Sequence, residues 1–151
     1  MKYRDLLEGA PQVGRVERIG LRPAKKAALI EVQEWTPGEG DHAKADGPRA
    51  VTLIQAEHVP VIAAILGKPV DALQMRRNVV VSGINLSSLM DRRFQLGELL
   101  LEATEICDPC KNMEAELGPG GFAAMVGMGG LCARIVRAGT LRVGDEVCAS
   151  S

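Results

Sequence analysis

Cys110 is the residue of this sequence whose type and position are best suited to chemistry. It belongs to the stretch Cys107-Asp108-Pro109-Cys110-Lys111-Asn112-Met113-Glu114. Residues from Lys111 to Leu117 have the composition of a short helix, which Gly118-Pro119 would end. The Cys110 thiol would then lie at or just before a helix N-terminus, where unpaired N–H groups favour a thiolate over a thiol. A thiolate can attack an electrophile, carry a sulfur atom or bind a soft metal.

Cys107 and Cys110 form a C-x-x-C pair whose role has several interpretations. A zinc site needs a second such pair or histidines at matched spacing, and neither Cys132 nor Cys148 supplies one. A thioredoxin-like redox pair needs a βαβ context, whereas this neighbourhood is β-rich and glycine-rich. Cys107 therefore either shares in the chemistry of Cys110 or is a buried small apolar residue.

Glycines downstream of the cysteines are a second candidate feature. Gly118-Pro119-Gly120-Gly121 and Gly127-Met128-Gly129-Gly130 either bring the backbone close to a ligand, with N–H groups free for an anion, or only form tight turns. Neither run matches a P-loop or a dinucleotide fingerprint, because the Lys-Ser/Thr pair and the strand–helix context are missing. Gly129 and Gly130 remain candidates for ligand binding.

Several cationic side chains complete the candidate site. Arg76, Arg77 and Arg134 can each bind a phosphate or a carboxylate bidentately. His42, beside Asp41 in a long loop, can orient or protonate a substrate. These candidates are far apart in the sequence, so the fold must bring them together.

The elements that position these residues are mostly short strands. Leu6 to Gln12 is a short lead-in, and Val13 to Leu21 alternates apolar and polar residues like a half-buried strand. Further strands are expected at residues 27–32, 50–54, 78–81, 94–96, 99–104, 131–138, 140–143 and 146–148. A helical segment is expected at 55–66, ending at Gly67, and residues 71–77 are expected to form a second helical turn or an irregular connection. These elements indicate a mainly β fold, a barrel with a few short helices inserted.

Two segments that connect the expected strands are rich in polar residues. Arg22-Pro23-Ala24-Lys25-Lys26 is a turn with three cations. Gln33 to Arg49 is a long polar loop rich in glycine and proline, which is typical of a lid, a ligand-binding loop or a disordered segment.

Composition limits the possible functions. The chain has 151 residues, 46% of them hydrophobic, 25% charged and 3% aromatic, with a formal net charge of -1. These values predict a single domain with an aliphatic core and no nucleic-acid surface. The N-terminus lacks the apolar region of a signal peptide and no apolar run can span a bilayer, so we expect a cytoplasmic protein without a membrane partner. Its four cysteines are then expected to be thiols rather than a disulfide framework.

A family resemblance emerges from these residues in combination. The segments that carry it are Gly40-Asp41-His42, Val51 to His58, Arg76-Arg77-Asn78 continuing to Leu86, Arg93 to Glu98, Cys107 to Glu114, and Gly139 to Val147. Together they resemble the signature of MOSC domains, named for the C-terminal domain of molybdenum cofactor sulfurase. The resemblance extends from about Val13 to Val147, which would make residues 1–151 one MOSC domain.

The resemblance implies a strongly twisted, closed β-barrel of the pyruvate-kinase barrel type. It also implies an essential cysteine, which corresponds best to Cys110 and either carries sulfur as a persulfide or ligates the molybdenum of a molybdopterin cofactor. The phosphate of that cofactor would require arginines such as Arg76, Arg77 or Arg134, and Asn78 belongs to the same signature.

Some features depart from the family pattern. No pyridoxal-phosphate desulfurase domain is recognisable, so the chain is not expected to bind pyridoxal phosphate or to mobilise sulfur from cysteine by itself. Met128 occupies a position where relatives have His, and Asp41 and His42 are adjacent where relatives have an intervening Arg. Both positions would affect specificity if they contact a ligand.

Three functions remain open from the sequence. The chain could carry sulfur or molybdenum cofactor to a partner such as a cysteine desulfurase or a molybdoenzyme. It could instead be a small molybdoenzyme that reduces N-hydroxylated compounds, with electrons from a separate reductase, because no flavin or iron–sulfur signature is present. The third alternative is a binding module whose cysteines are structural.

Overall fold

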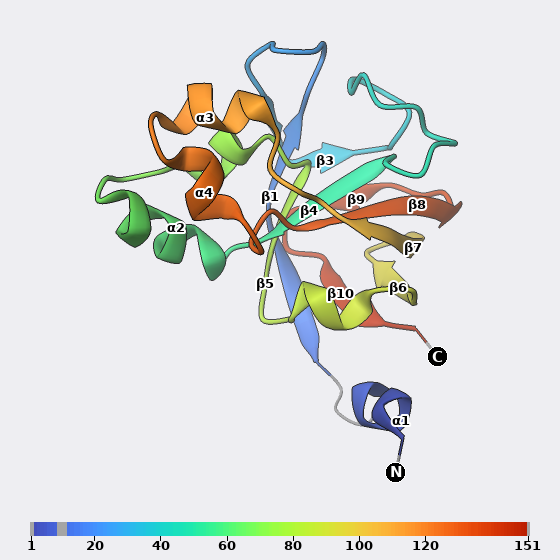
Figure 1. Ribbon diagram of the computed structural model, residues 1–151. Coiled ribbons are helices and arrows are strands. Elements are labelled where there is room, and N and C mark those ends of the chain that lie inside the picture. The colour runs from blue at the N-terminus through green and yellow to red at the C-terminus, as the bar shows by residue number, and fades with distance from the viewer. Residues whose placement is uncertain (1, 9–11, 151) are drawn as a thin grey trace.

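Seven strands form a closed barrel in the computed structural model, which describes residues 2–8 and 12–150 (Figure 1). The strands are β1 (Val13–Leu21), β4 (Val51–Gln55), β5 (Val79–Ser82), β6 (Arg93–Leu96), β7 (Leu99–Ile106), β8 (Leu131–Arg137) and β10 (Glu146–Ala149). Their order around the barrel is β1-β5-β4-β8-β7-β6-β10, and β10 pairs with β1 to close it. The predicted closed, mainly β barrel is confirmed.

Three shorter strands lie outside this ring. β2 (Ile30–Val32) extends the sheet beyond β1, and β3 (Glu34–Trp35) pairs with β9 (Leu141–Arg142). The predicted strand at 27–32 is therefore shortened to three residues. β3 interrupts the long loop expected from residue 33, because Trp35 is buried in the core opposite Leu141.

Side chains alternate between the two faces of the barrel wall, as they must along a strand. In β4, Val51 and Leu53 belong to the core inside the barrel, whereas Ile54 packs in a separate cluster on the outside. Thr52 shares the outward face of Ile54, and Cys132 in β8 is likewise flanked by two residues of the inner core. Residues on this outer face are available to a site built against the barrel wall.

Helices cover the outer face of β4 and β5. They are α2 (His58–Leu66), α3 (Lys111–Leu117) and α4 (Gly121–Met125), and their buried residues pack with Ile54 and Val80. β4 and β5 are parallel, so their connection must cross over, and it does so through α2 and a 3₁₀ turn at Ala72–Met75. α2 ends as predicted at Gly67, which has a positive φ of 73°.

Other sequence predictions agree to different degrees with the structure. The hairpin of β6 and β7 forms around Gly97-Glu98 as expected. α4 was not predicted, since its glycine-rich surroundings indicated turns. A second 3₁₀ turn occupies Leu86–Leu89. The lead-in is helical in α1 (Tyr3–Glu8), and residues 9–11 of it lie outside the described ranges.

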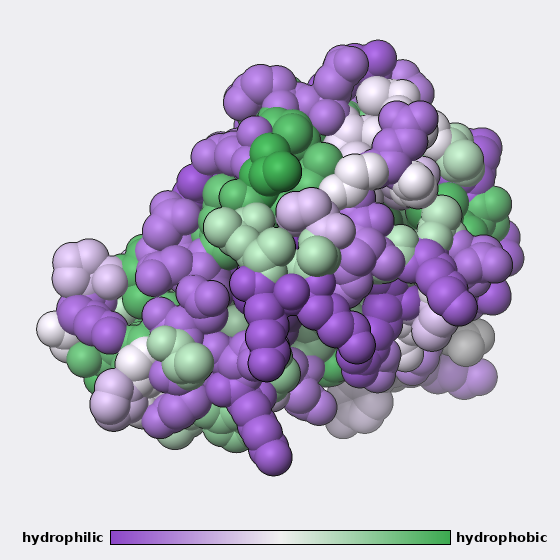
Figure 2. All heavy atoms as spheres, turned by 90° about the horizontal axis from the view of Figure 1, so that it is seen from above, coloured by the Kyte–Doolittle hydropathy of each residue, from purple (hydrophilic) through white to green (hydrophobic). Residues whose placement is uncertain are grey.

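The upper part of the molecule in Figure 1 is formed by α3 and by the loops that follow β1 and β3. Seen from that side, most of the surface consists of hydrophilic residues (Figure 2). No helix within residues 2–8 and 12–150 has the length and apolar character needed to cross a membrane.

Candidate functional site

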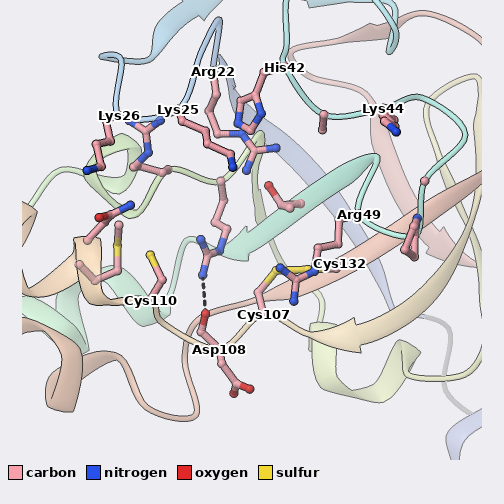
Figure 3. Close-up of a pocket in the computed structure, with 18 residues that line it drawn as sticks. Arg22, Lys25, Lys26, His42, Lys44, Arg49, Cys107, Asp108, Cys110 and Cys132 are labelled. Carbon is pink, nitrogen blue, oxygen red and sulfur yellow. Dashed lines mark hydrogen bonds between the residues drawn. A yellow bond between two sulfur atoms is a disulfide. The ribbon is translucent and has the colours of Figure 1, made fainter.

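A cavity of about 680 Å³ brings together several of the predicted site residues. Its walls come from the turn after β1, the loop before β4, the segment before β5 and the segment from Cys107 to Met113 (Figure 3). Thr52 and Cys132, on the outer face of the barrel, complete the lining. The cavity is therefore built on the barrel wall from four segments that are distant in the sequence.

Positive charge dominates this cavity. Seven of its lining residues are lysines or arginines: Arg22, Lys25, Lys26, Lys44, Arg49, Arg76 and Arg77. His42 adds an imidazole, and the only carboxylate among the described lining residues is Asp108. Such a concentration of cations attracts anions, and arginines in particular recognise phosphates and carboxylates.

Arg77 is the buried cation of the cavity, with only 7% of its surface exposed. Its guanidinium donates hydrogen bonds to three backbone carbonyls, those of Gly129 at 2.7 Å, Met75 at 3.0 Å and Asp108 at 3.4 Å. Burial lowers the pKa of Arg77 to about 10, while its electrostatic interaction with Cys110 acts in the opposite direction. A buried cation held by carbonyls alone is suited to an anionic partner.

Asp41 fixes the loop that carries His42. Its carboxylate accepts hydrogen bonds from the Arg22 backbone at 2.7 Å, from the Arg22 guanidinium at 3.2 Å and from Asn78 Nδ2 at 3.0 Å. Burial by itself would raise the pKa of Asp41, but the hydrogen bonds from Arg22 and Ala43 outweigh it, and the pKa lies below its ordinary value. Asp41 thus positions Arg22 and His42 at the cavity rather than lining it.

Cys110 lies at the cavity with a free, exposed thiol. It is the N-cap residue of α3, as the sequence predicted. The preference of this thiol for the thiolate form stays a prediction.

Cys107 differs from its prediction as a thiol. It forms a disulfide with Cys132, and both residues line the cavity. The sequence could not indicate this pairing, because the two residues are 25 positions apart and meet only through the antiparallel pairing of β7 with β8.

Gly129 and Gly130 lie behind the cavity wall rather than in its lining. A Cβ at Gly129 would overlap the carbonyl oxygen of Cys107, and one at Gly130 would overlap that of Leu53. Gly130 also has a positive φ of 96°, and its carbonyl accepts a hydrogen bond from the Cys107 N–H at 2.8 Å. These glycines allow the close backbone packing that places Cys107 and Arg77.

Two other predicted site residues are also outside the lining. Asn78 is fully buried just before β5, and its side chain bonds to Thr52 in β4 and to the carbonyl of Gly20 in β1. Arg134 lies further along β8, where it pairs with Glu102 at 2.9 Å. His42, Arg76, Arg77, Cys107 and Cys110 are the predicted residues that the structure brings together.

The candidate list from the sequence lacked Arg22, Lys25, Lys26, Lys44 and Arg49. The cationic turn at 22–26 was visible in the sequence, but its position over the cavity depends on bonds such as that from the His42 N–H to the Arg22 carbonyl, at 2.8 Å. No local pattern reveals such a contact between two loops.

Comparison with solved structures reveals the same fold in other proteins. YuaD from Bacillus subtilis has a TM-score of 0.74 at 18% identity, over 94% of this chain and 99% of YuaD. YiiM from Geobacillus stearothermophilus has a TM-score of 0.77 at 16% identity, over 91% and 75% of the two chains. YiiM from Escherichia coli has a TM-score of 0.71 at 19% identity, over 91% and 70%. At these identities, the likeness shows the fold alone.

Family membership rests on the sequence itself. Among curated proteins, none gave a significant match to this chain. The family model of the MOSC domain, however, matches residues 39–148, which include the segment before β5, Cys110 and the closing strands. The chain therefore belongs to the MOSC domain family, which is associated with the molybdenum cofactor.

Proposed function

We propose that this chain binds molybdenum cofactor in the cationic cavity, with Cys110 as a soft ligand for the metal. The observation that carries the proposal is the position of a free, exposed thiol on a cavity lined by seven lysines and arginines. Thiolates are suitable ligands for soft metals, and the cations suit the phosphate of a molybdopterin.

The charges of the cavity fit such a group. Among the described residues, Arg22 pairs with Asp41 and Arg49 with Glu105. The other five cations, Lys25, Lys26, Lys44, Arg76 and Arg77, have no carboxylate partner there. A phosphate would supply the missing negative charge, so the donor set agrees with an anionic cofactor.

In this proposal each residue of the cavity has a separate role. Arg77 and its neighbouring cations hold the anion, Asp41 keeps Arg22 in place, and Cys110 presents its sulfur to the metal. The cofactor, when bound, would supply a molybdenum centre capable of two-electron redox chemistry. Among the described residues, no cluster of His, Cys, Asp and Glu gathers three ligands for a metal. In the proposal Cys110 would be the one protein ligand of the metal.

The exposed thiol of Cys110 also supports a second candidate function, sulfur transfer. The Cys110 thiolate would attack the outer sulfur of a donor persulfide, an S–S bond would form on Cys110, and the donor cysteine would leave as a thiolate. This reaction needs a partner that generates the persulfide, for example a cysteine desulfurase. It requires an accessible thiol, which Cys110 has.

Cofactor content after expression tests the proposal. The chain would be produced in a host that makes molybdenum cofactor, purified without oxygen, and assayed for molybdenum and oxidised pterin. Wild type and Cys110→Ala would be compared with Cys148→Ala, a matched control that removes the other free cysteine. We expect cofactor in wild type and Cys148→Ala and its loss in Cys110→Ala.

Other outcomes would contradict the proposal or refine it. Wild type without molybdenum and pterin would contradict cofactor binding, and a persulfide mass increment on Cys110 would then favour sulfur transfer. Cofactor-loaded protein that reduces a hydroxylamine with an added reductase would identify an enzyme rather than a carrier.

A further inference from the structure

Three of the four cysteines line one cavity, and the proposed function uses one of them. Cys110 is free, whereas Cys107 and Cys132 are joined in a disulfide that forms part of the same wall. Cys148, the fourth, is in β10 and outside the cavity lining. The disulfide needs an explanation of its own, because its position is next to the segment that carries the proposed ligand.

The disulfide is not needed to align the strands that it joins. Cys107 follows the last residue of β7, and Cys132 is the second residue of β8. The backbone already pairs here, with Ile106 opposite Leu131 and the Cys107 N–H bonded to the Gly130 carbonyl at 2.8 Å. The constraint that the disulfide adds therefore falls mainly on the residues after Cys107, where the ladder has ended.

Those residues, Asp108 to Cys110, have few other attachments to the barrel. The Arg77 guanidinium donates to the Asp108 carbonyl, but at 3.4 Å this is a long hydrogen bond. Pro109 has no N–H to donate. The Cys110 carbonyl accepts a bond from the Met113 N–H, which belongs to its own helix and gives no connection to the barrel. On its C-terminal side the segment is anchored by α3, whose Met113 and Leu117 are buried in one cluster with Ile54 and Val80 of the barrel wall. On its N-terminal side the disulfide is the covalent attachment of the segment to the cavity wall.

The surroundings of the disulfide restrict which reductants can reach it. Cys107 is 6% exposed and Cys132 is 2% exposed, so burial slows attack on the bond, and a reductant must be small enough to enter the cavity that both residues line. The cations of the cavity stabilise a thiolate, which is the leaving group when a disulfide is opened.

We propose that the Cys107–Cys132 disulfide is a redox-sensitive lock on the segment that carries Cys110, and that a dithiol reductant opens it. A reductant thiolate attacks one protein sulfur, the S–S bond breaks, and the second protein sulfur leaves as a thiolate. The second thiol of the reductant then attacks the reductant sulfur of this mixed disulfide, and the first protein sulfur leaves as a thiolate. The protein gains two electrons and two protons as the thiols of Cys107 and Cys132, and the dithiol becomes a cyclic disulfide.

The consequence of opening is a looser Cys110 segment. With the lock closed, Cys110 is held at one place in the cavity, ready for a ligand. With the lock open, Asp108 to Cys110 and the first residues of α3 are held less firmly, and the ligand is held less tightly. Control of ligand retention by redox state rests on the proposed cofactor-binding function, whereas the lock itself does not.

The lock is tested first without any ligand. Protein purified without reductant would be titrated with dithiothreitol, and cysteines would be mapped by alkylation and mass spectrometry. We expect Cys110 and Cys148 to be alkylated before reduction and all four cysteines afterwards. Hydrogen exchange of the peptide spanning Asp108 to Asn112 should become several-fold faster on reduction, while the peptide of β1 should be unchanged.

Variants separate the lock from general damage to the fold. The double variant Cys107→Ser/Cys132→Ser should exchange like reduced wild type with or without dithiothreitol, and Cys148→Ser should respond like wild type. A thermal melt of each sample checks that the barrel remains folded. Four alkylated cysteines before reduction, or exchange at Asp108 to Asn112 that is the same in both redox states, would overturn the proposal.

Cofactor retention then distinguishes the two proposals. Protein loaded in a cofactor-producing host should release molybdenum and pterin several-fold faster after dithiothreitol treatment, and the Cys107→Ser/Cys132→Ser variant should be insensitive. Loaded protein whose release of cofactor does not change with reduction would overturn the control of ligand retention by the lock and leave cofactor binding intact. Absence of cofactor from every sample would contradict the proposed function. Alkylation and hydrogen exchange would still test whether the disulfide acts as a lock.

Discussion

Arg77 is both charged and buried, so its contacts indicate its role. Its guanidinium is buried and bears no carboxylate partner among the described residues. It bonds to the carbonyl of Met75 in its own segment and to those of Gly129 and Asp108 in two other segments. It therefore has a structural role in holding those segments and, in our proposal, a binding role toward an anion. Both roles can be measured in one variant.

We expect Arg77→Ala to lower the cofactor content of the protein about tenfold, because a charge-assisted hydrogen bond to the anion is lost. The free energy of unfolding should fall by about 2 kcal/mol, since buried carbonyls lose their donor. Pterin assay and urea denaturation measure the two effects. Arg134→Ala is the control, because Arg134 pairs with Glu102 outside the cavity lining. Equal cofactor loss in both variants would contradict the role of Arg77.

The lowered pKa of Asp41 predicts a specific dependence of the free energy of unfolding on pH. Its folded pKa lies below the ordinary 3.8. A carboxylate with a lowered folded pKa stabilises the protein above its unfolded pKa, and this contribution is lost as the pH falls through the folded value. Asp41→Asn should therefore be destabilising at neutral pH, by about 1–3 kcal/mol, and the difference from wild type should shrink below pH 3.8.

Urea denaturation between pH 2 and pH 7, with exposed Asp46→Asn as the control, measures this difference. If the difference in free energy of unfolding between wild type and Asp41→Asn stays constant between pH 2 and pH 7, the hydrogen bonds from Arg22 do not stabilise the ionised form of Asp41.

Secondary-structure elements could be predicted where local patterns decide them. The alternation of apolar and polar residues from Val13 to Leu21 correctly predicted β1, and Gly67 correctly predicted the end of α2. β3 could not be predicted in this way, because its two residues form a strand only through pairing with β9, more than a hundred positions away. α4 was missed because Gly120 and Gly121 favour turns in isolation, while in the structure Gly121 packs closely against Leu117.

Two glycines between α4 and β8 provide a matched test of close packing. Gly127 and Gly130 both have positive φ, 82° and 96°. A Cβ at Gly127 meets nothing within 4 Å, whereas one at Gly130 overlaps the Leu53 carbonyl. Gly127→Ala should cost about 1 kcal/mol for the left-handed backbone, and Gly130→Ala about 3 kcal/mol or more, because the backbone must also shift. Equal losses in urea denaturation would contradict the proposed role of Gly130 in packing.

The whole molecule determines which candidate residues become neighbours. The sequence indicated a β-barrel, a reactive Cys110 and arginines at 76 and 77, and the structure places these three residues on one cavity. It did not indicate that the turn at 22–26 and the loop at 42–49 supply the five other lysines and arginines of the lining, since the order of strands around the barrel decides this. Arg134 was a reasonable candidate by residue type, but two residues beyond Cys132 in β8 its guanidinium pairs with Glu102 outside the cavity lining.

The central claim is that one cavity holds molybdenum cofactor through its cations and Cys110. Native mass spectrometry of protein purified without oxygen from a cofactor-producing host tests it most directly. We expect one adduct of cofactor mass per chain in wild type and Cys148→Ala, its loss in Cys110→Ala, and an adduct about tenfold weaker in Arg77→Ala. An adduct at the wild-type level in Cys110→Ala and Arg77→Ala, or a wild-type chain that carries none, would contradict cofactor binding in this cavity.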